Sequence, residues 1–529
     1  MRRRVSVPLA IVCCGIIALV SHLAAQGRAP MSQVAYLKAS NPGAYHHLGE
    51  GGALPGHTGN SVALSRDGNT IAVGASHESS GARGINGQPD ESAYATGAVY
   101  VFTRTGAGWS PQAYVKASNA DSGDHFGSSV ALSADGNTMA VAAHWEKSDA
   151  TGVNGNQADN SIAQAGAVYV FTRSGGTWSQ QAYLKASNTG EKGDENEPID
   201  GDQFGFSLAL SADGNTVAVG AISEDGSIAG YPDDNAAMSA GAVYVFTRSG
   251  NTWSQQAYVK PPTAADATAG DLFGFSVSLS ADGSTLGVGV YDEGGSSREI
   301  NGRLDTMRGG SGAAYVFTRT GVIWMQQAYL KVSTAERGDS WGVSLALSDD
   351  GNTLALGSVD EDCAATGVNP PGCDTDQPDN TSTGAVAVFS RNGTTWTQQA
   401  LLKASNTGVE DWFGIRLAVS GDGNSLAVAA SNEDGGAHGI NGRQDDDTAI
   451  DAGAVYLFTR TGTTWAQDAY IKSMYNEAFD EFGNSVALSA DGATMAVGAR
   501  GEDGGGRGAD GDPTDNSIDE SGAVFMFRR

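Results

Sequence analysis

The chain has 529 residues, with 60 Asp and Glu against 31 Lys and Arg, 74 Gly and 40% hydrophobic residues. The formal net charge of −29 at pH 7 repels phosphates and anionic lipids, which argues against binding to nucleic acid or to a membrane surface. The composition fits neither collagen, a disordered tail nor a multispanning membrane protein, so we expect a soluble, loop-rich fold.

The first residues have the pattern of a secretory signal peptide. Three arginines precede an apolar run from Val5 to Val20, and small residues follow at Ala24 and Ala25. We therefore predict a signal peptide over residues 1–25 and a secreted, periplasmic or cell-surface location. An uncleaved membrane anchor is the alternative, because Leu23 stands where a cleavage site normally has a small residue.

Two of the four cysteines, Cys13 and Cys14, lie inside that apolar segment. Cys363 and Cys373 are left in the mature chain, where they close one short loop. In an oxidising compartment this arrangement favours a disulfide, and a reactive thiol pair is the alternative.

The remainder of the chain is a sevenfold repeat. The aspartate of the phrase Ser-Ala-Asp-Gly-Asn-Thr and its variants recurs at intervals of 68 to 78 residues. The seven copies are at Asp67, Asp135, Asp213, Asp282, Asp350, Asp422 and Asp491. These periods leave no room for a second domain, so we predict one domain over residues 31–529, with repeats starting near 59, 126, 204, 273, 341, 413 and 482.

Each period contains four short apolar runs bounded by turn residues. In the second period they are Phe126 to Ser133, Thr138 to Ala143, Gly166 to Arg173 and Trp178 to Lys185. Their alternation and their β-branched and aromatic residues indicate strands of an antiparallel meander, and no segment has helical periodicity. Radial repetition of four-stranded units predicts an all-β fold, a seven-bladed β-propeller.

The two chain ends complete each other. The last period stops at Arg529, after its third run, Gly522 to Phe527, so its fourth strand is missing. The segment Gln33 to Ala39 (QVAYLKA) matches fourth strands such as Gln181 to Ala186 (QAYLKA). We therefore predict that the N-terminal strand closes the last blade.

Recurrent Phe-Gly pairs, such as Phe126-Gly127, are followed by Val-Gly-Ala variants and then by Gly-Ala-Val-Tyr-Val-Phe. This order resembles FG-GAP repeats, the units of the integrin α-chain propeller, and most resembles those of secreted bacterial proteins. The resemblance implies a propeller that serves as a binding or adhesion module. It departs from the calcium-binding repeats, because a short turn around residues such as Asp67 replaces the family's Asp-rich loop, so that calcium site is not carried over.

Acidic residues recur in phase with the repeat on the face that we expect to carry the long loops. Hard oxygen ligands at the base of a loop match what Ca²⁺ requires. The candidate calcium ligands are Glu78 and Asp90, Glu146 and Asp159, Glu224 and Asp234, Glu293 and Asp305, Glu433 and Asp446, and Glu502 and Asp515. A further Asp precedes the Phe-Gly step by two residues, at Asp124, Asp202, Asp271, Asp339, Asp411 and Asp480.

The alternative to calcium is a structural role for the same carboxylates. They would accept hydrogen bonds from loop N–H groups, and each Glu would pair with a Lys that recurs in the fourth strand. The Lys series is Lys38, Lys116, Lys185, Lys260, Lys331, Lys403 and Lys472. Lys on an outer strand also discourages edge-to-edge pairing. A recurrent Trp, at Trp178 in the second period, favours packing between blades over glycan binding.

One cluster is not repeated. Six histidines fall in loops of the first two blades, where residues 44–59 also break the repeat. They are His46, His47, His57, His77, His125 and His144. Since function is grafted onto a fold, this break predicts a ligand site, and free drift of a joining loop is the alternative.

The sequence favours a secreted or cell-surface binding or adhesion module, monomeric, calcium-dependent and with an acidic ligand-binding face for an extracellular protein or glycan. No Gly-x-Ser-x-Gly, phosphate-loop or His-Glu-x-x-His motif is present. The alternative is a propeller enzyme, a polysaccharide lyase or glycoside hydrolase, that uses His and Glu of blades one and two as acid and base.

Overall fold

The computed structural model describes residues 29–51, 59–190, 201–227, 235–261, 268–307, 309–373, 381–509 and 511–529. The predicted signal peptide, His57 and Asp234 lie outside these residues. Every regular element in the described ranges is a β-strand, and they contain no helix of the length and apolarity needed to cross a membrane.

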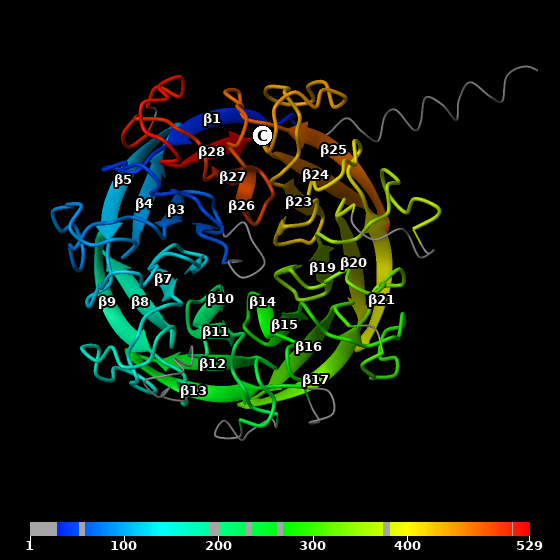
Figure 1. Cartoon of the computed structure of the whole chain (residues 1–529), viewed down its shortest axis with the longest axis horizontal. Helices are drawn as coiled ribbons and strands as arrows, with labels where there is room; N and C mark the ends of the chain where they lie inside the picture. The colour runs from blue at the N-terminus through cyan, green and yellow to red at the C-terminus, as the bar shows by residue number, and fades with distance from the viewer. Residues whose placement is uncertain are drawn as a thin grey trace, which may run out of the picture.

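The strands form seven four-stranded antiparallel sheets arranged in a ring (Figure 1). Blades one to three contain β2 (Val62–Leu64), β3 (Thr70–Ala75), β4 (Ala98–Thr105) and β5 (Gly108–Val115); β6 (Val130–Leu132), β7 (Thr138–Ala143), β8 (Ala167–Ser174) and β9 (Thr177–Leu184); and β10 (Phe204–Leu210), β11 (Thr216–Ala221), β12 (Ala242–Ser249) and β13 (Thr252–Val259). Blades four and five contain β14 (Phe273–Leu279), β15 (Thr285–Val290), β16 (Ala313–Thr320) and β17 (Ile323–Leu330); and β18 (Ser344–Leu347), β19 (Thr353–Ser358), β20 (Ala385–Asn392) and β21 (Thr395–Leu402). Blade six contains β22 (Arg416–Val419), β23 (Ser425–Ala430), β24 (Ala454–Thr461) and β25 (Thr464–Ile471). The predicted all-β, seven-bladed β-propeller is confirmed.

Blade seven contains both ends of the described chain. Its sheet has the order β1-β28-β27-β26, formed by β1 (Ser32–Leu37), β26 (Phe482–Leu488), β27 (Thr494–Ala499) and β28 (Ala523–Arg528). Strand β1 pairs antiparallel with β28, from Ser32 opposite Arg528 to Leu37 opposite Val524. The C-terminus is marked beside these two strands in Figure 1. The predicted closure of the ring by the N-terminal strand is confirmed.

Packing between blades explains the composition of the strands. The second strand of every blade is buried along its whole length, because both faces of each sheet are covered by neighbouring blades. Small and β-branched residues such as those of β7, TMAVAA, meet that requirement. The glycine of the Phe-Gly pair has φ between 82° and 112° in all seven blades, a conformation that L side chains rarely adopt.

In blade one the Phe-Gly place is taken by Leu48-Gly49, upstream of the predicted start near residue 59. The Gly49 carbonyl accepts a 2.7 Å hydrogen bond from Ser485 Oγ of blade seven, as the Gly274 carbonyl does from Ser207 Oγ. Strand β2 begins only at Val62, so the break in the repeat lies between the Phe-Gly place and the first strand of blade one.

The innermost strands surround a central channel with a cavity volume of about 290 Å³. The end of the channel at the short Asp-Gly turns is narrowed by a ring of backbone hydrogen bonds, 2.8–3.0 Å long, that passes through all seven blades. Its members are Arg66, Ala134, Ala212, Ala281, Asp349, Gly421 and Ala490. The ion pair between Arg66 of blade one and Asp349 of blade five, 2.5 Å long, crosses this end. The opposite end, at the long loops, is the one we call the mouth.

Candidate functional site at the mouth of the channel

The long loops fold back onto the outer strands of their own blades. In blade one, Asn86 N donates to the Tyr114 carbonyl at 2.7 Å, and Asn86 Oδ1 accepts from Tyr114 N at 3.0 Å. The same exchange joins Asn154 to Tyr183, Asn301 to Tyr329, Asn369 to Leu401 and Asn441 to Tyr470. The loop between the second and third strands and the end of the fourth strand therefore lie on one face, as the meander geometry predicts.

Every recurrent Glu at the base of these loops forms an ion pair with the Lys of its fourth strand. The pairs are Glu78–Lys116, Glu146–Lys185, Glu224–Lys260, Glu293–Lys331, Glu361–Lys403, Glu433–Lys472 and Glu502–Lys38, with N–O distances of 2.6–2.9 Å. Each of these Lys residues is at most 2% exposed, so they do not protect an exposed sheet edge. Burial lowers the pKa of six of them, and the Glu partner opposes that shift; the six are Lys38, Lys116, Lys185, Lys260, Lys403 and Lys472.

Other donors occupy the remaining carboxylate positions of this network. In blade one, Glu78 accepts hydrogen bonds from Tyr114 Oη at 2.8 Å, from Asn41 Nδ2 at 3.0 Å and from Ser80 N at 3.2 Å. Asn41 belongs to the segment after β1, so the contact also joins blade seven to blade one. The recurrent Glu residues therefore have the Lys and N–H partners that a structural role requires, which is the alternative to calcium binding.

The recurrent Asp near the C-terminal end of the long loop accepts hydrogen bonds from N–H groups of the same loop. Asp90 Oδ1 accepts from Gly81 N at 2.8 Å and from Ser92 N at 3.1 Å, and Asp305 accepts from Ser296 N at 2.8 Å. These hydrogen bonds lower the pKa of Asp90 and Asp305. Calcium binding at the Glu and Asp pairs stays a prediction, and an ion at the Glu would have to replace the Lys ammonium group.

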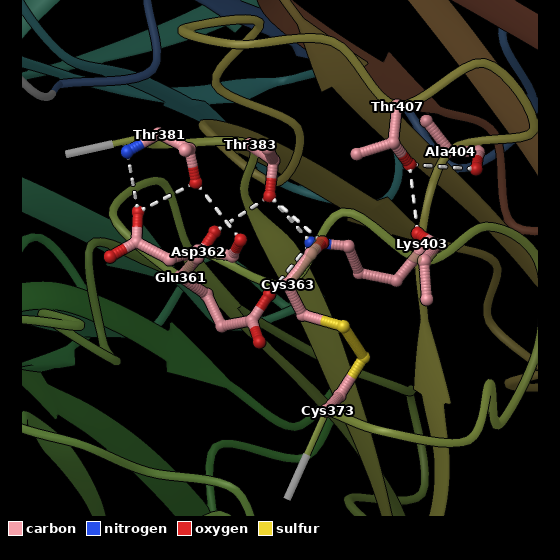
Figure 2. Close-up of a disulfide and its surroundings, with 10 residues drawn as sticks. Glu361, Asp362, Cys363, Cys373, Thr381, Thr383, Lys403, Ala404 and Thr407 are labelled. Carbon is pink, nitrogen blue, oxygen red and sulfur yellow. Dashed lines mark hydrogen bonds and ion pairs between the residues drawn. A yellow bond between two sulfur atoms is a disulfide. The ribbon is translucent and has the colours of Figure 1, made fainter. Parts of the chain in front are cut away.

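Blade five lacks the Tyr hydroxyls of this network. Leu401 stands where blade one has Tyr114, and Cys363 and Cys373 form a disulfide beside Glu361, with a Cα–Cα distance of 5.2 Å. Figure 2 shows the disulfide next to the Glu361 carboxylate and Lys403. The covalent link therefore anchors the loop in a blade that lacks the Tyr hydroxyl.

Four of the predicted histidines form a row along the mouth, which we call the histidine row. Ring centroids are 4.9 Å apart for His47 and His77, 4.7 Å for His77 and His125, and 6.0 Å for His125 and His144. His46 is buried, and its Nε2 atom lies 3.3 Å from Glu91 Oε2 instead. The structure thus brings together residues from four separate loops of blades one and two, before β2, after β3, before β6 and after β7.

Glu50 is the centre of the site, and the sequence reasoning missed it. Its Oε2 atom accepts from His77 Nδ1 at 2.8 Å and from Ser76 Oγ at 2.6 Å, and its Oε1 atom lies 3.5 Å from His47 Nδ1. Burial alone would raise the pKa of Glu50, but the hydrogen bonds from His47 and His77 hold it well below its ordinary value. Glu50 is therefore an ionised carboxylate that is only 7% exposed.

Three further charged residues complete the cluster. Arg500 Nη1 lies 3.6 Å from Glu50 Oε1, and the same guanidinium binds both oxygens of Glu481. Glu520 Oε2 lies 3.0 Å from His47 Nε2. Burial would lower the pKa of His47, but its hydrogen bonds to Glu50 and Glu520 outweigh burial and raise it. We call His47, Glu50, His77, Glu481, Arg500 and Glu520 the mouth cluster.

The mouth cluster marks a division of the ring into two halves. The residue after the Phe-Gly glycine is polar in blades seven, one and two (Asn484, Glu50, Ser128) and apolar in blades three to six (Phe206, Phe275, Val343, Ile415). The apolar four belong to one core cluster with Ile222 and Val359, and Phe206 and Phe275 have ring centroids 5.2 Å apart. A comparison of the seven copies at this position would have identified Glu50.

Arg416 is a second residue that such a comparison would have identified. It stands in β22 where six copies have Ser, and it lines the channel. Its Nη1 atom donates to the Ile415 carbonyl at 2.8 Å, and burial lowers its pKa to about 10. The mouth therefore combines carboxylates, imidazoles and guanidinium groups on one side with apolar side chains on the other.

The chain is similar to a known repeat family and, at low identity, to solved structures. The FG-GAP repeat family matches residues 109–171, 396–458 and 465–527. No curated protein matches the chain. Among solved structures the chain is similar to a putative 6-phosphogluconolactonase from Bacteroides uniformis, at 12% identity and a TM-score of 0.44, over 80% of this chain and 88% of that one. It is also similar to the Cps50 (Swd1) β-propeller domain of Myceliophteria thermophila, at 8% identity and a TM-score of 0.47, over 94% of this chain and 100% of that one. The repeat matches in three places, the seven blades and the closing strand together support an FG-GAP repeat β-propeller.

Proposed function

We propose that the chain is a secreted or cell-surface binding module that recognises an extracellular protein or glycan at the mouth of its channel. The observation that carries the proposal is the mouth cluster, because its combination of charged groups occurs once, whereas the buried Glu–Lys pairs at the loop bases occur in every blade. The packed repeats need none of these residues, so a role in recognition accounts for them.

The geometry of the channel supports recognition at this end. The hydrogen-bonded ring and the Arg66–Asp349 pair narrow the opposite end, so a ligand has access through the mouth. Side chains of the cluster range from buried Glu50 to half-exposed Glu520, which offers polar contacts at several depths. Few convergent polar groups beside apolar side chains are typical of ligand sites.

The test is a screen of the purified chain on a glycan array and on immobilised extracellular matrix proteins. A variant with His47→Ala and His77→Ala should lose the binding that the native chain shows, and a cooperative melting transition establishes that it is still folded. His438→Ala is the matched control, since His438 is an exposed histidine of a blade-six loop. Equal binding by the double variant and the native chain would move the site away from the mouth cluster.

A propeller enzyme is the second candidate, and the hydrogen bond between His77 and Glu50 favours it. An imidazole oriented by a carboxylate is the arrangement of a general base. The same screen distinguishes the two functions, because an enzyme releases shortened or unsaturated saccharides from a bound polysaccharide whereas a binding module leaves it intact. Calcium dependence is a separate part of the proposal and concerns the loops rather than the mouth cluster.

A further inference from the structure

We infer that His47, Glu50 and His77 form a site for one divalent transition-metal ion, with Zn²⁺ as its representative. One ligand atom from each of the three residues lies within 4.8 Å of the other two. Among the described residues, the other such group is Glu361 with the two cysteines of the disulfide, whose sulfurs are already bonded to each other. None of the predicted calcium ligands belongs to either group. The site goes beyond the proposed function, because metal binding is measured without any partner.

The spacing of the three side chains suits a small ion. Two ligands held about 2.1 Å from Zn²⁺ in tetrahedral geometry are about 3.4 Å apart. The distance from Glu50 Oε1 to His47 Nδ1 is 3.5 Å, and that from Glu50 Oε2 to His77 Nδ1 is 2.8 Å. Small rotations of the side chains would therefore bring all three atoms to one ion.

The donor set selects the class of metal. Two imidazoles and one carboxylate are the ligands of open zinc sites, whereas Ca²⁺ and Mg²⁺ prefer oxygen ligands alone. Three protein ligands leave a fourth position for water or for an oxygen of a bound partner. Because the side chain of His77 is 28% exposed, that position is open to solvent.

The surroundings supply the outer contacts that such a site needs. Glu520 Oε2 accepts from His47 Nε2 at 3.0 Å, which would orient the imidazole so that Nδ1 faces the ion. Ser76 Oγ donates to Glu50 at 2.6 Å and fixes the carboxylate. Carboxylate–histidine contacts of this kind accompany most histidine ligands.

The charge of the mouth cluster also favours a cation. Glu50, Glu481 and Glu520 share one guanidinium, that of Arg500, which leaves two negative charges when the histidines are neutral. A divalent ion neutralises them. The ion takes the place of the proton that His77 Nδ1 shares with Glu50, so binding releases protons and strengthens as pH rises.

The test is a calorimetric titration of the chelator-treated, dialysed full chain with Zn²⁺ alone. We expect one ion per chain, and at least about 100-fold weaker binding in His77→Ala and in Glu50→Gln. Glu520→Gln removes a positioning contact rather than a ligand, so it should weaken binding about 10- to 100-fold. His438→Ala should bind as the native chain does. The melting temperature of each variant establishes that it is folded, and His47→Gln replaces Glu50→Gln if the latter does not fold.

Absence of binding, or an equal affinity in His77→Ala and His438→Ala, would overturn the inference. Substitution of Co²⁺ provides an independent readout, because tetrahedral coordination by nitrogen and oxygen gives visible absorption that the His77→Ala variant should lack. A titration with Ca²⁺ separates this site from the loop sites, since the same variants should leave any calcium binding unchanged. Partner binding measured with and without Zn²⁺ then tests the proposed function on its own.

Discussion

Carboxylates are buried both at the bases of the long loops and in the mouth cluster. The two regions differ in the partners of these carboxylates and in how often the arrangement recurs. At the loop bases the same Glu–Lys pair occurs seven times, with N–O distances that differ by only 0.3 Å. At the mouth, Glu50 faces two histidines and an arginine that no other blade repeats. A charge that recurs in every blade is required by the fold, whereas a charge that occurs once is available for function. The predictions below test this division.

The largest effect is expected from removal of the closing strand β1, which also removes the partners of Glu502. Deletion of residues 31–39 takes away β1, and with it the contacts of Tyr36 Oη and Lys38 Nζ with Glu502 at 2.6 and 2.7 Å. The outer edge of β28 would then be unpaired and Glu502 would be buried without its cation, so we expect aggregation or a large fall in melting temperature. Light scattering and calorimetry measure the outcome. A melting profile equal to that of the full chain would contradict the closure.

A single pair can be broken without touching the strands. Lys116→Met leaves Glu78 buried without its cation and should lower the free energy of unfolding by about 3–5 kcal/mol. Adding Glu78→Gln removes the uncompensated charge and should recover part of that loss. Urea denaturation measures both variants. A loss under about 1 kcal/mol in the single variant would mean that the recurrent pairs are not needed for stability.

The recurrent features of the loop bases can be predicted from the sequence, whereas the mouth cluster and the partners of the recurrent Glu residues cannot. The spacing of the repeats predicts the blades, the closing strand and the Glu and Lys series, because each feature recurs at the equivalent position of the seven repeats. The partners of the Glu residues do not follow from phase, since calcium and lysine both satisfy a buried carboxylate. The mouth cluster draws on Glu50, Glu481 and Arg500, which lie up to 450 residues apart and meet only when the ring closes.

Buried aspartates before the Phe-Gly step should make stability depend on pH. Burial raises the pKa of Asp202 and of Asp480 to about 8, and that of Asp339 to about 7. Because these values exceed the ordinary pKa near 4, the folded chain holds protons that the unfolded chain has lost, and their contribution to stability is lost as pH rises through 7 to 8. The turn aspartates, such as Asp67, have a lowered pKa, so their contribution is lost as pH falls below about 4.

We therefore expect the highest melting temperature near pH 4 and a decline from there to about pH 8, at constant ionic strength. Asp202→Asn mimics the protonated carboxyl and should flatten the decline. Asp305 is the control, because its pKa is lowered rather than raised, so Asp305→Asn should leave the decline unchanged. A melting temperature that rises steadily to pH 8 would show that these carboxyls are not kept protonated by burial in the folded chain.

The smallest effect concerns the seam between blades seven and one, where the repeat lacks one contact. At the five seams from blade one to blade six, a bulged Gln of the outer strand accepts from the Trp Nε1 of the next blade, as Gln112 does from Trp178 at 3.0 Å and Gln181 from Trp253 at 2.9 Å. Strand β1 has Val34 at this place, and the buried Nε1 of Trp109 has no hydrogen-bond partner among the described residues. Val34→Gln should supply the acceptor and raise the free energy of unfolding by about 0.5–1.5 kcal/mol, while Gln181→Val should lower it by a similar amount. Because Val34 is 42% exposed, the substitution adds no buried volume. Denaturant unfolding of both variants tests the pair, and a gain at the seam without the matching loss at Gln181 would show that the effect does not come from the Trp contact.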